Sequence, residues 1–348
     1  MVYVVMAVQF ESLRYPFVIL LAVPLGIVGV VLGLLVTATS ISVLALIGAA
    51  LWLRNRGVLK QEHSPTLARM ITDLMLPALI FSSLSRHPLE LDRMPPALIM
   101  LVTTLTMLAL AWWIGRRIGL GPAQLGAFVL VAGVGSSSTI GYTLVGQVFR
   151  GDPEAAFDAV MIGEIGAMLP LFLVGVPIGI HFGTQASGGE AAKGEHWREV
   201  RAFARSPIFL AMVAGFAASF LPQPEWTVIG VFYRVLEILG NALPVYVALT
   251  IGLLLRPVSW RTAAIPIAAV LLLKLMIEPV LAAQLATIGH VPRLERNVLV
   301  IEAAMPSGTI ATIVAARYGC DGGFASTVVV ISYVASLLSI PLLVMLTT

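Results

Sequence analysis

Long apolar stretches separated by short polar segments form the dominant pattern of the chain. From Ser40 onward the pattern predicts ten membrane-spanning helices. These lie at 40–53, 65–84, 95–114, 122–149, 155–180, 207–221, 226–255, 262–288, 298–316 and 324–346. Another apolar stretch, Tyr15–Val36, predicts one extra helix ahead of them. The fold class expected is an all-α polytopic membrane protein.

One of these spans is interrupted in its middle. Within Val298–Tyr318 stand Pro306, Ser307, Gly308 and Thr309. Proline removes a backbone donor and breaks the helical ladder. Irregular backbone at membrane depth is tolerated only where it is buried in protein or lines a polar cavity, so the break indicates a binding site. A simple proline kink is the alternative.

A second interrupted span lies in the first half of the chain. Phe128–Phe149 carries Gly133, Gly135, the run Ser136–Thr139 and Gly141 in its middle. Other residues recur at nearly constant offset: Thr139 with Thr309, Asp152 with Asp321, Pro170 with Pro341, Pro96 with Pro266 and Pro77 with Pro244. Five spans in each half invert the second half relative to the first. The pattern predicts a 5+5 inverted repeat with two crossed broken helices.

This repeat divides the chain into four expected parts. Residues 1–38 form the extra N-terminal segment, and residues 39–182 form the first five-helix repeat. Residues 183–205 form a polar loop between the halves, and residues 206–348 form the second repeat.

Composition supports the membrane class. The 348 residues are 59% hydrophobic and 11% charged, with a mean hydropathy of +0.97, whereas about 25% of residues are charged in soluble domains. The basic residues are scattered in loops without aromatic platforms, so no nucleic-acid partner is expected. Cys320 is the single cysteine, which leaves no internal disulfide or cysteine metal cluster.

The distribution of basic residues predicts the orientation. With the end of the span at Leu53 placed in the cytoplasm, fourteen Lys and Arg residues fall inside and five fall outside. The central loop is then cytoplasmic and the C-terminus lies outside.

Hydroxyl groups gather at both breaks, and we expect them to bind substrate. The candidate residues are Ser136, Ser137, Ser138 and Thr139 in the first break and Pro306, Ser307, Gly308 and Thr309 in the second. Half-helix N-termini present unpaired N–H groups and a positive dipole end, which favour a carboxylate. The alternative is that Ser and Thr only pack helices closely.

Charged residues inside spans are candidates for coupling or electrostatic support. Lys274 is expected to attract an anion or to neutralise Glu278, one helical turn away. Glu302 and Glu164 are candidates for proton coupling or substrate contact, against a structural hydrogen-bonding role. Asp73 is a further candidate, expected to face cytoplasmic water.

Signatures of enzymes are missing from the sequence. It has no GxSxG, no HExxH and no phosphate-binding loop ending in Lys-Ser or Lys-Thr. We therefore expect no enzymatic activity, no catalytic residues, no metal site and no cofactor other than a coupling proton or sodium ion.

Four segments together resemble the auxin efflux carrier family, which includes bacterial malonate or malate carriers. They are Leu74–Leu84, Leu239–Leu255, Leu273–Ala282 and Glu302–Gly319. The resemblance implies a scaffold part and a transport part, an organic anion as substrate, a homodimer and a bacterial inner membrane. The family usually has Asn, Thr and Gly before a Gly-x-Pro at the first crossing. This chain has Ser136 to Ser138 before Gly141, Tyr142 and Thr143.

The N-terminal segment resembles a different family. Val4–Gly48 is similar to a piece of the resistance-nodulation-division efflux pumps, with an FES…PF turn. It contains none of that family's proton-relay carboxylates, so no efflux-pump function is expected from it. A fusion or a gene-boundary artefact is the expected origin.

These patterns favour a secondary carrier of a small organic anion, a mono- or dicarboxylate, that works by alternating access where the broken helices cross. A sodium- or proton-coupled carrier of bile-acid or antiporter type is the alternative within transport. An antiporter would need acidic residues at the crossing, where the sequence offers hydroxyls. An inactive fused membrane protein is a further alternative.

Overall fold

The computed structural model describes residues 43–86, 93–188, 204–219, 227–256 and 260–347. The predicted helix at 15–36 lies outside these residues. Within the described part, every regular element is helical, and one isolated β-bridge joins Gly135 to Ser307. The all-α prediction is confirmed.

The helices follow the predicted spans closely, with one or more helical segments for each span. They are α3 Val43–Asn55, α4 Ser64–Met70, α5 Leu76–Arg86, α6 Met94–Ile118, α7 Pro122–Gly133, α8 Tyr142–Val148, α9 Pro153–Met161, α10 Val176–Ala186, α12 Pro207–Ser219, α13 Thr227–Leu254, α14 Trp260–Leu272, α15 Glu278–Ile288, α16 Arg293–Ala303, α17 Thr309–Arg317 and α18 Gly322–Thr347. Six continuous helical stretches in the described part are long and apolar enough to cross a membrane. The protein is therefore a multi-pass membrane protein.

Short π-helical turns interrupt several spans, and prolines explain four of them. These turns cover Ile71–Met75, Ile162–Met168, Leu171–Gly175 and Leu273–Ile277, and each ends two residues before a proline. Because proline has no N–H group, the carbonyl four residues before it loses its helical partner. The residue preceding the proline bonds five residues back instead, as Glu278 N does to Leu273 O. Such turns occur often at functional sites.

A fifth π-helical turn, Ser137–Gly141, follows the first break without help from a proline. Position 143, two residues after Gly141, is where the family pattern has its proline, and this chain has Thr143. Tyr142 N still donates to Ser137 O, five residues back. The missing proline therefore does not remove the turn.

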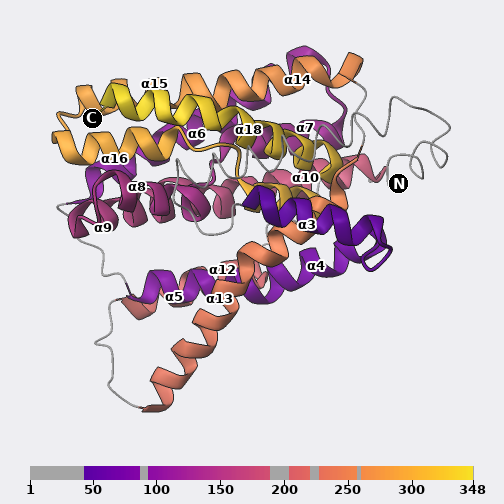
Figure 1. The fold of residues 1–348 in the computed structure, drawn as a ribbon, viewed down its shortest axis with the longest axis horizontal. Helices are drawn as coiled ribbons and strands as arrows, with labels where there is room; N and C mark the ends of the chain where they lie inside the picture. Colours follow the sequence, from indigo (N-terminus) through magenta and orange to yellow (C-terminus); the bar gives the residue numbers. More distant parts are fainter. Residues whose placement is uncertain (1–42, 87–92, 189–203, 220–226, 257–259, 348) are drawn as a thin grey trace, which may run out of the picture.

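The helices form two groups. In one, α12 packs against α5, and α13 packs against α3 and α5. In the other, α6, α7, α10 and the helices from α14 to α18 pack together. Figure 1 shows α5, α12 and the start of α13 at the bottom of the view, apart from the second group. Both broken helices belong to the second group.

Candidate functional site

The breaks of the two interrupted helices lie side by side and antiparallel. Ser136 N donates to Pro306 O at 2.9 Å, and Gly308 N donates to Val134 O at 2.8 Å. Each break thus satisfies backbone groups that its own helix leaves unpaired. The predicted crossing of two broken helices is present, and its residues are buried.

Small residues allow this close approach. A Cβ atom on Gly308 would lie 3.0 Å from Gly135 O and 3.1 Å from Val134 O, both backbone atoms. A Cβ atom on Gly135 would lie 2.8 Å from Lys274 Nζ. Glycine at 308 therefore avoids a tight contact with the partner backbone, and glycine at 135 leaves the space that the Lys274 ammonium group fills.

The two breaks differ in length. Three residues, Val134–Ser136, separate α7 from the next helical turn, whereas five residues, Ala304–Gly308, separate α16 from α17. The offset between the halves therefore grows from 170 before the breaks (Gly133 to Ala303) to 172 after them (Ser137 to Thr309). The expected pairing of Thr139 with Thr309 is wrong at the crossing, where Ser137 is the equivalent of Thr309.

The hydroxyl groups of the crossing have mixed roles. Ser136 and Tyr333 share a hydrogen bond of 2.6 Å between their hydroxyls, and Ser307 N donates to Ser332 Oγ at 3.2 Å. Among the described residues, the buried hydroxyls of Ser137 and Ser307 have no hydrogen-bond partner. Ser138 and Thr139 lie in the π-helical turn, and their side chains are outside the described part.

Two residues of α18 complete this arrangement, and sequence reasoning missed them. Ser332 and Tyr333 are buried against the breaks. Their signal was a serine next to the single tyrosine of α18, and a count of charged residues overlooks both.

Lys274 and Glu278 form a fully buried ion pair beside the first break. Both side chains are 0% exposed, and Lys274 Nζ lies against Gly135. A buried charge needs a partner at close range. Of the two expected roles, neutralisation of Glu278 is present, and the pair also supports the backbone at the crossing.

Glu302 also lies at the crossing. Its carboxyl group sits over Gly141, where a Cβ atom would come 2.5 Å from Oε1 and 2.6 Å from Cδ. The side chain is 0% exposed, and the Ser137 hydroxyl lies beside it, although neither oxygen makes a well-formed hydrogen bond among the described residues. The crossing therefore contains an acidic group as well as hydroxyls, and the expectation of hydroxyls alone was wrong.

Glu164 and Asp73 have different positions relative to this centre. Tyr142, which follows Gly141, donates its hydroxyl to Glu164 Oε1 at 3.1 Å. Glu164 is thus linked to the first turn after the crossing. Asp73 instead pairs with Arg317 at 3.7 Å, at the far end of α17, and its side chain is 46% exposed. The structure brings Glu164 towards the site and leaves Asp73 away from it.

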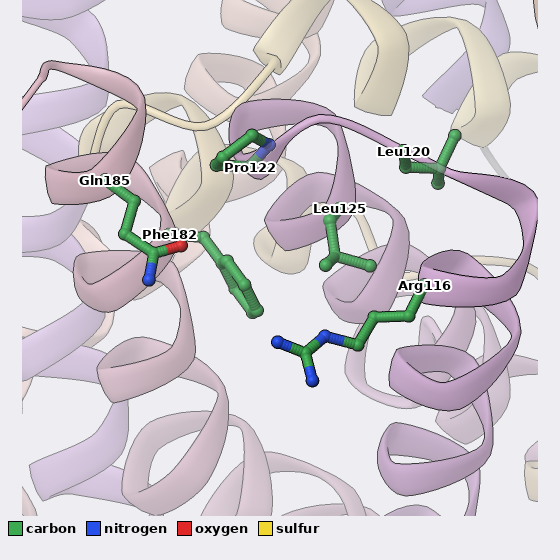
Figure 2. A pocket seen from close by; sticks show the side chains of 6 residues that line it. All are labelled: Arg116, Leu120, Pro122, Leu125, Phe182 and Gln185. Atoms are coloured by element: carbon green, nitrogen blue, oxygen red, sulfur yellow. The ribbon is translucent and has the colours of Figure 1, made fainter.

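The crossing is closed in this conformation. A small hollow lined by Val134–Ser136, Met168 and Gly308–Ala311 has no room for a water molecule. A larger pocket of about 390 Å³ lies at the other end of α7, where Arg116 and Gln185 face it with Leu120, Pro122, Leu125 and Phe182 (Figure 2). This surface pocket is separate from the two breaks.

Comparisons with known proteins agree with the architecture. A family described as membrane transport protein matches residues 34–180 and 198–344, and the AcrB/AcrD/AcrF family matches residues 1–53. A transporter of unknown specificity from Methanothermobacter thermautotrophicus is 27% identical over 308 residues, covering 88% of this chain and 96% of the relative. A similar transporter from Methanocaldococcus jannaschii is 23% identical over 299 residues, covering 82% of this chain and 90% of the relative. Both resemblances that the motifs indicated are confirmed.

Proposed function

The chain belongs to the membrane transport protein family, and we propose that it is a secondary carrier of a small organic anion. The anion is a mono- or dicarboxylate, and it binds where the two broken helices cross. Alternating access then exposes this crossing to one side of the membrane at a time. The protein is a carrier rather than an enzyme.

One observation supports this proposal above the others. Two helical N-termini, at Ser137 and Thr309, begin beside each other at the paired breaks. Their unpaired N–H groups and positive dipole ends favour an anion without a full positive charge. The buried hydroxyls of Ser137 and Ser307, which lack partners in the described part, are donors for its oxygens. Ser136, Ser138, Thr139, Pro306, Gly308 and Thr309 complete the proposed substrate-binding set.

The closed hollow fits one intermediate of such a cycle. It has no room for water, so the helix group that holds the breaks must move relative to α3–α5, α12 and α13 before an anion enters. We assign the group that holds the breaks to transport and the group of α3–α5, α12 and α13 to the scaffold and homodimer contact. We place the protein in a bacterial inner membrane, with residues 183–205 cytoplasmic, the C-terminus outside and 39–182 and 206–348 as inverted repeats.

A reconstitution experiment tests the carrier proposal. Purified full-length protein is first screened for thermal stabilisation by mono- and dicarboxylates at two pH values, because a ligand that binds only the folded state raises its stability. The stabilising anions are then tested for uptake into vesicles under substrate, proton and sodium gradients. Uptake of a carboxylate supports the proposal. No uptake by folded protein would favour the inactive fused product instead.

Two changes to the chain refine this test. Pro306→Ala restores a backbone donor, so the break can close, and we expect uptake to fall more than thermal stability does. Pro122→Ala, at the first turn of α7 where no donor is needed, is the matched control. Unchanged uptake in Pro306→Ala would contradict a working break. Deletion of residues 1–38 is expected to leave uptake intact, since the N-terminal segment matches another family.

Glu302 also bears on which ion gradient drives the carrier. Glu302 at the crossing favours a proton- or sodium-coupled carrier over an uncoupled one, and this is the specific observation behind the alternative of bile-acid or antiporter type. Gradients of each ion in the vesicle assay separate these cases.

A further inference from the structure

The surroundings of Glu302 differ from those of every other charged side chain at the crossing. It lies in the last turn of α16 and is 0% exposed, and the Ser137 hydroxyl lies beside its carboxyl group. Neither carboxyl oxygen makes a well-formed hydrogen bond in the described part of the chain. Gly141 leaves the space that its carboxyl group fills. Burial of an ionised carboxylate without partners is strongly unfavourable, whereas the neutral acid is far easier to bury. The geometry therefore suits a group that gains and loses a charge during the cycle.

The groups around Glu302 favour a proton over a metal cation as the ion that binds there. Lys274 lies within electrostatic reach of Glu302 but is already paired with Glu278. Its ammonium group disfavours any positive charge added at Glu302, but a proton needs only one carboxyl oxygen, whereas a metal cation needs several oxygen ligands. No group of three or more acidic, His or Cys residues that could hold a metal ion occurs among the described residues. A proton fits this position better than Na⁺.

A hydroxyl connects this buried acid to a less buried one. Tyr142, next to Gly141, lies within electrostatic reach of both Glu302 and Glu164 and donates to Glu164 Oε1 at 3.1 Å. Gly163 leaves room for the tyrosine ring, because a Cβ atom there would lie 2.6 Å from Tyr142 Cε1. Glu164 is partly exposed, whereas Glu302 is fully buried.

We propose that Glu302 is the proton-binding site of the carrier and that Tyr142 and Glu164 conduct the proton to it. When Glu164 is protonated, its O–H donates to the Tyr142 oxygen, and the Tyr142 hydroxyl, which otherwise donates to Glu164 Oε1, rotates and gives its own proton to the Glu302 carboxylate. The net change is the transfer of one proton from Glu164 to Glu302. This inference rests on the proposed carrier function, since a proton that moves without cargo would serve no transport.

Infrared spectroscopy tests the site without any substrate. The carbonyl stretch of a neutral carboxylic acid is measured on purified full-length protein as the pH is raised through neutrality. We expect a band from a buried neutral acid that is absent in Glu302→Gln and present in Glu62→Gln. Glu62 is the matched control because its side chain is 67% exposed on a surface turn. A neutral-acid signal that is identical in Glu302→Gln and in the unchanged protein, or no such signal in the unchanged protein, would overturn the proposal, whereas a separate band from Glu164 is expected to persist.

The conduction step has its own test. Tyr142→Phe removes only the hydroxyl, and after a pH jump we expect the Glu302 band to change at least about tenfold more slowly, as for loss of a proton-transfer group. An unchanged rate would remove Tyr142 from the path.

Vesicle uptake of radiolabelled malonate then separates the two proposals. Malonate uptake that a proton gradient drives in the unchanged protein but not in Glu302→Gln supports the inference. Uptake driven by sodium alone, or by neither ion, would reject the proton site and leave the carrier standing. A titrating Glu302 band in a protein that moves no carboxylate would reject the carrier and, with it, the coupling role.

Discussion

The half-helix that begins at Ser137 and the half-helix that begins at Thr309 leave the crossing from equivalent positions, yet different side chains surround them. The first has the Glu302 carboxyl group against Gly141. When positions are counted from the start of each half-helix, Ile313 in the second half-helix is equivalent to Gly141 in the first. When positions are counted back from the ends of the helices before the breaks, Ala132 in α7 is equivalent to Glu302 in α16. Both residues are fully buried.

The second N-terminus is surrounded by hydroxyls and apolar groups instead. Ser136 and Tyr333 are hydrogen-bonded beside Thr309, and Met168 and Ala311 line the hollow. The repeated backbone therefore supplies two equivalent dipole ends, and side chains that the repeat does not share make them different. On our proposals, both ends favour the anion, and the Ser137 end also holds the proton.

The largest expected effect concerns Lys274, which lies against the first break at Gly135. Lys274→Met leaves Glu278 buried without its partner, which should lower the free energy of unfolding by about 3–5 kcal/mol. Counted from Pro96 and Pro266, the equivalent residue in α6 is Thr104, whose buried hydroxyl has no partner in the described part. Thr104→Val should change stability by less than about 1 kcal/mol. Thermal unfolding followed by tryptophan fluorescence measures both.

A double variant shows whether the cost comes from the unpaired carboxylate. Lys274→Met combined with Glu278→Leu should regain most of the lost stability, because no buried charge is left. If Thr104→Val and Lys274→Met cost the same, the two breaks are supported equally and the asymmetry is wrong.

A smaller effect is expected where the two breaks touch. Gly308→Ala places a methyl group 3.0 Å from Gly135 O, and backbone atoms cannot move aside easily. We expect a loss of about 1–3 kcal/mol in stability and weaker stabilisation by carboxylates in the thermal screen. Gly146→Ala in α8 is the control, since its Cβ would meet nothing within 4 Å. Equal stability of the two variants would show that the breaks are not tightly apposed.

The broken spans could be predicted from sequence because proline and glycine act on their own helix. Pro306 and the Lys274–Glu278 spacing have local consequences, a lost donor and a contact across one helical turn. The contacts of Glu302 with Gly141 and of Ser136 with Tyr333 join residues far apart in the chain. No local pattern encodes these contacts, so sequence could name Glu302 as a candidate, but its position against Gly141 and the role of α18 appear only in three dimensions.

The predicted pairing of residues between the two halves was wrong at the crossing for a related reason. The offset of 170 residues is correct for the helices before the breaks, but the second break contains two more residues than the first. Because threonine stands at both 139 and 309, the offset of 170 was expected to continue through the breaks. Asp73 was a candidate because it stands in an apolar span, and its contact with Arg317 depends on how α4 meets α17.

The Ser137 end can be altered through Gly141. Gly141→Ala directs a methyl group at the Glu302 carboxyl group, which is the movable end of a side chain. The cost in stability should be about 1–2 kcal/mol, less than for Gly308→Ala, because the carboxyl group can rotate away. The infrared band of Glu302 should shift. A band unchanged in position would mean that the carboxyl group does not lie against Gly141.

The smallest expected effect belongs to the Thr309 end. Tyr333→Phe removes the hydroxyl that bonds Ser136 at 2.6 Å, which should cost about 1 kcal/mol in stability. Because Ser136 then loses its fixed orientation, carboxylates should stabilise the variant less, while the infrared band of Glu302 stays in place. Tyr318→Phe, at the opposite end of α17, is the control and should change neither. If Tyr333→Phe moved the Glu302 band, the two ends would share one polar network, and the separation of the hydroxyl groups at the Thr309 end from the proton site would be wrong.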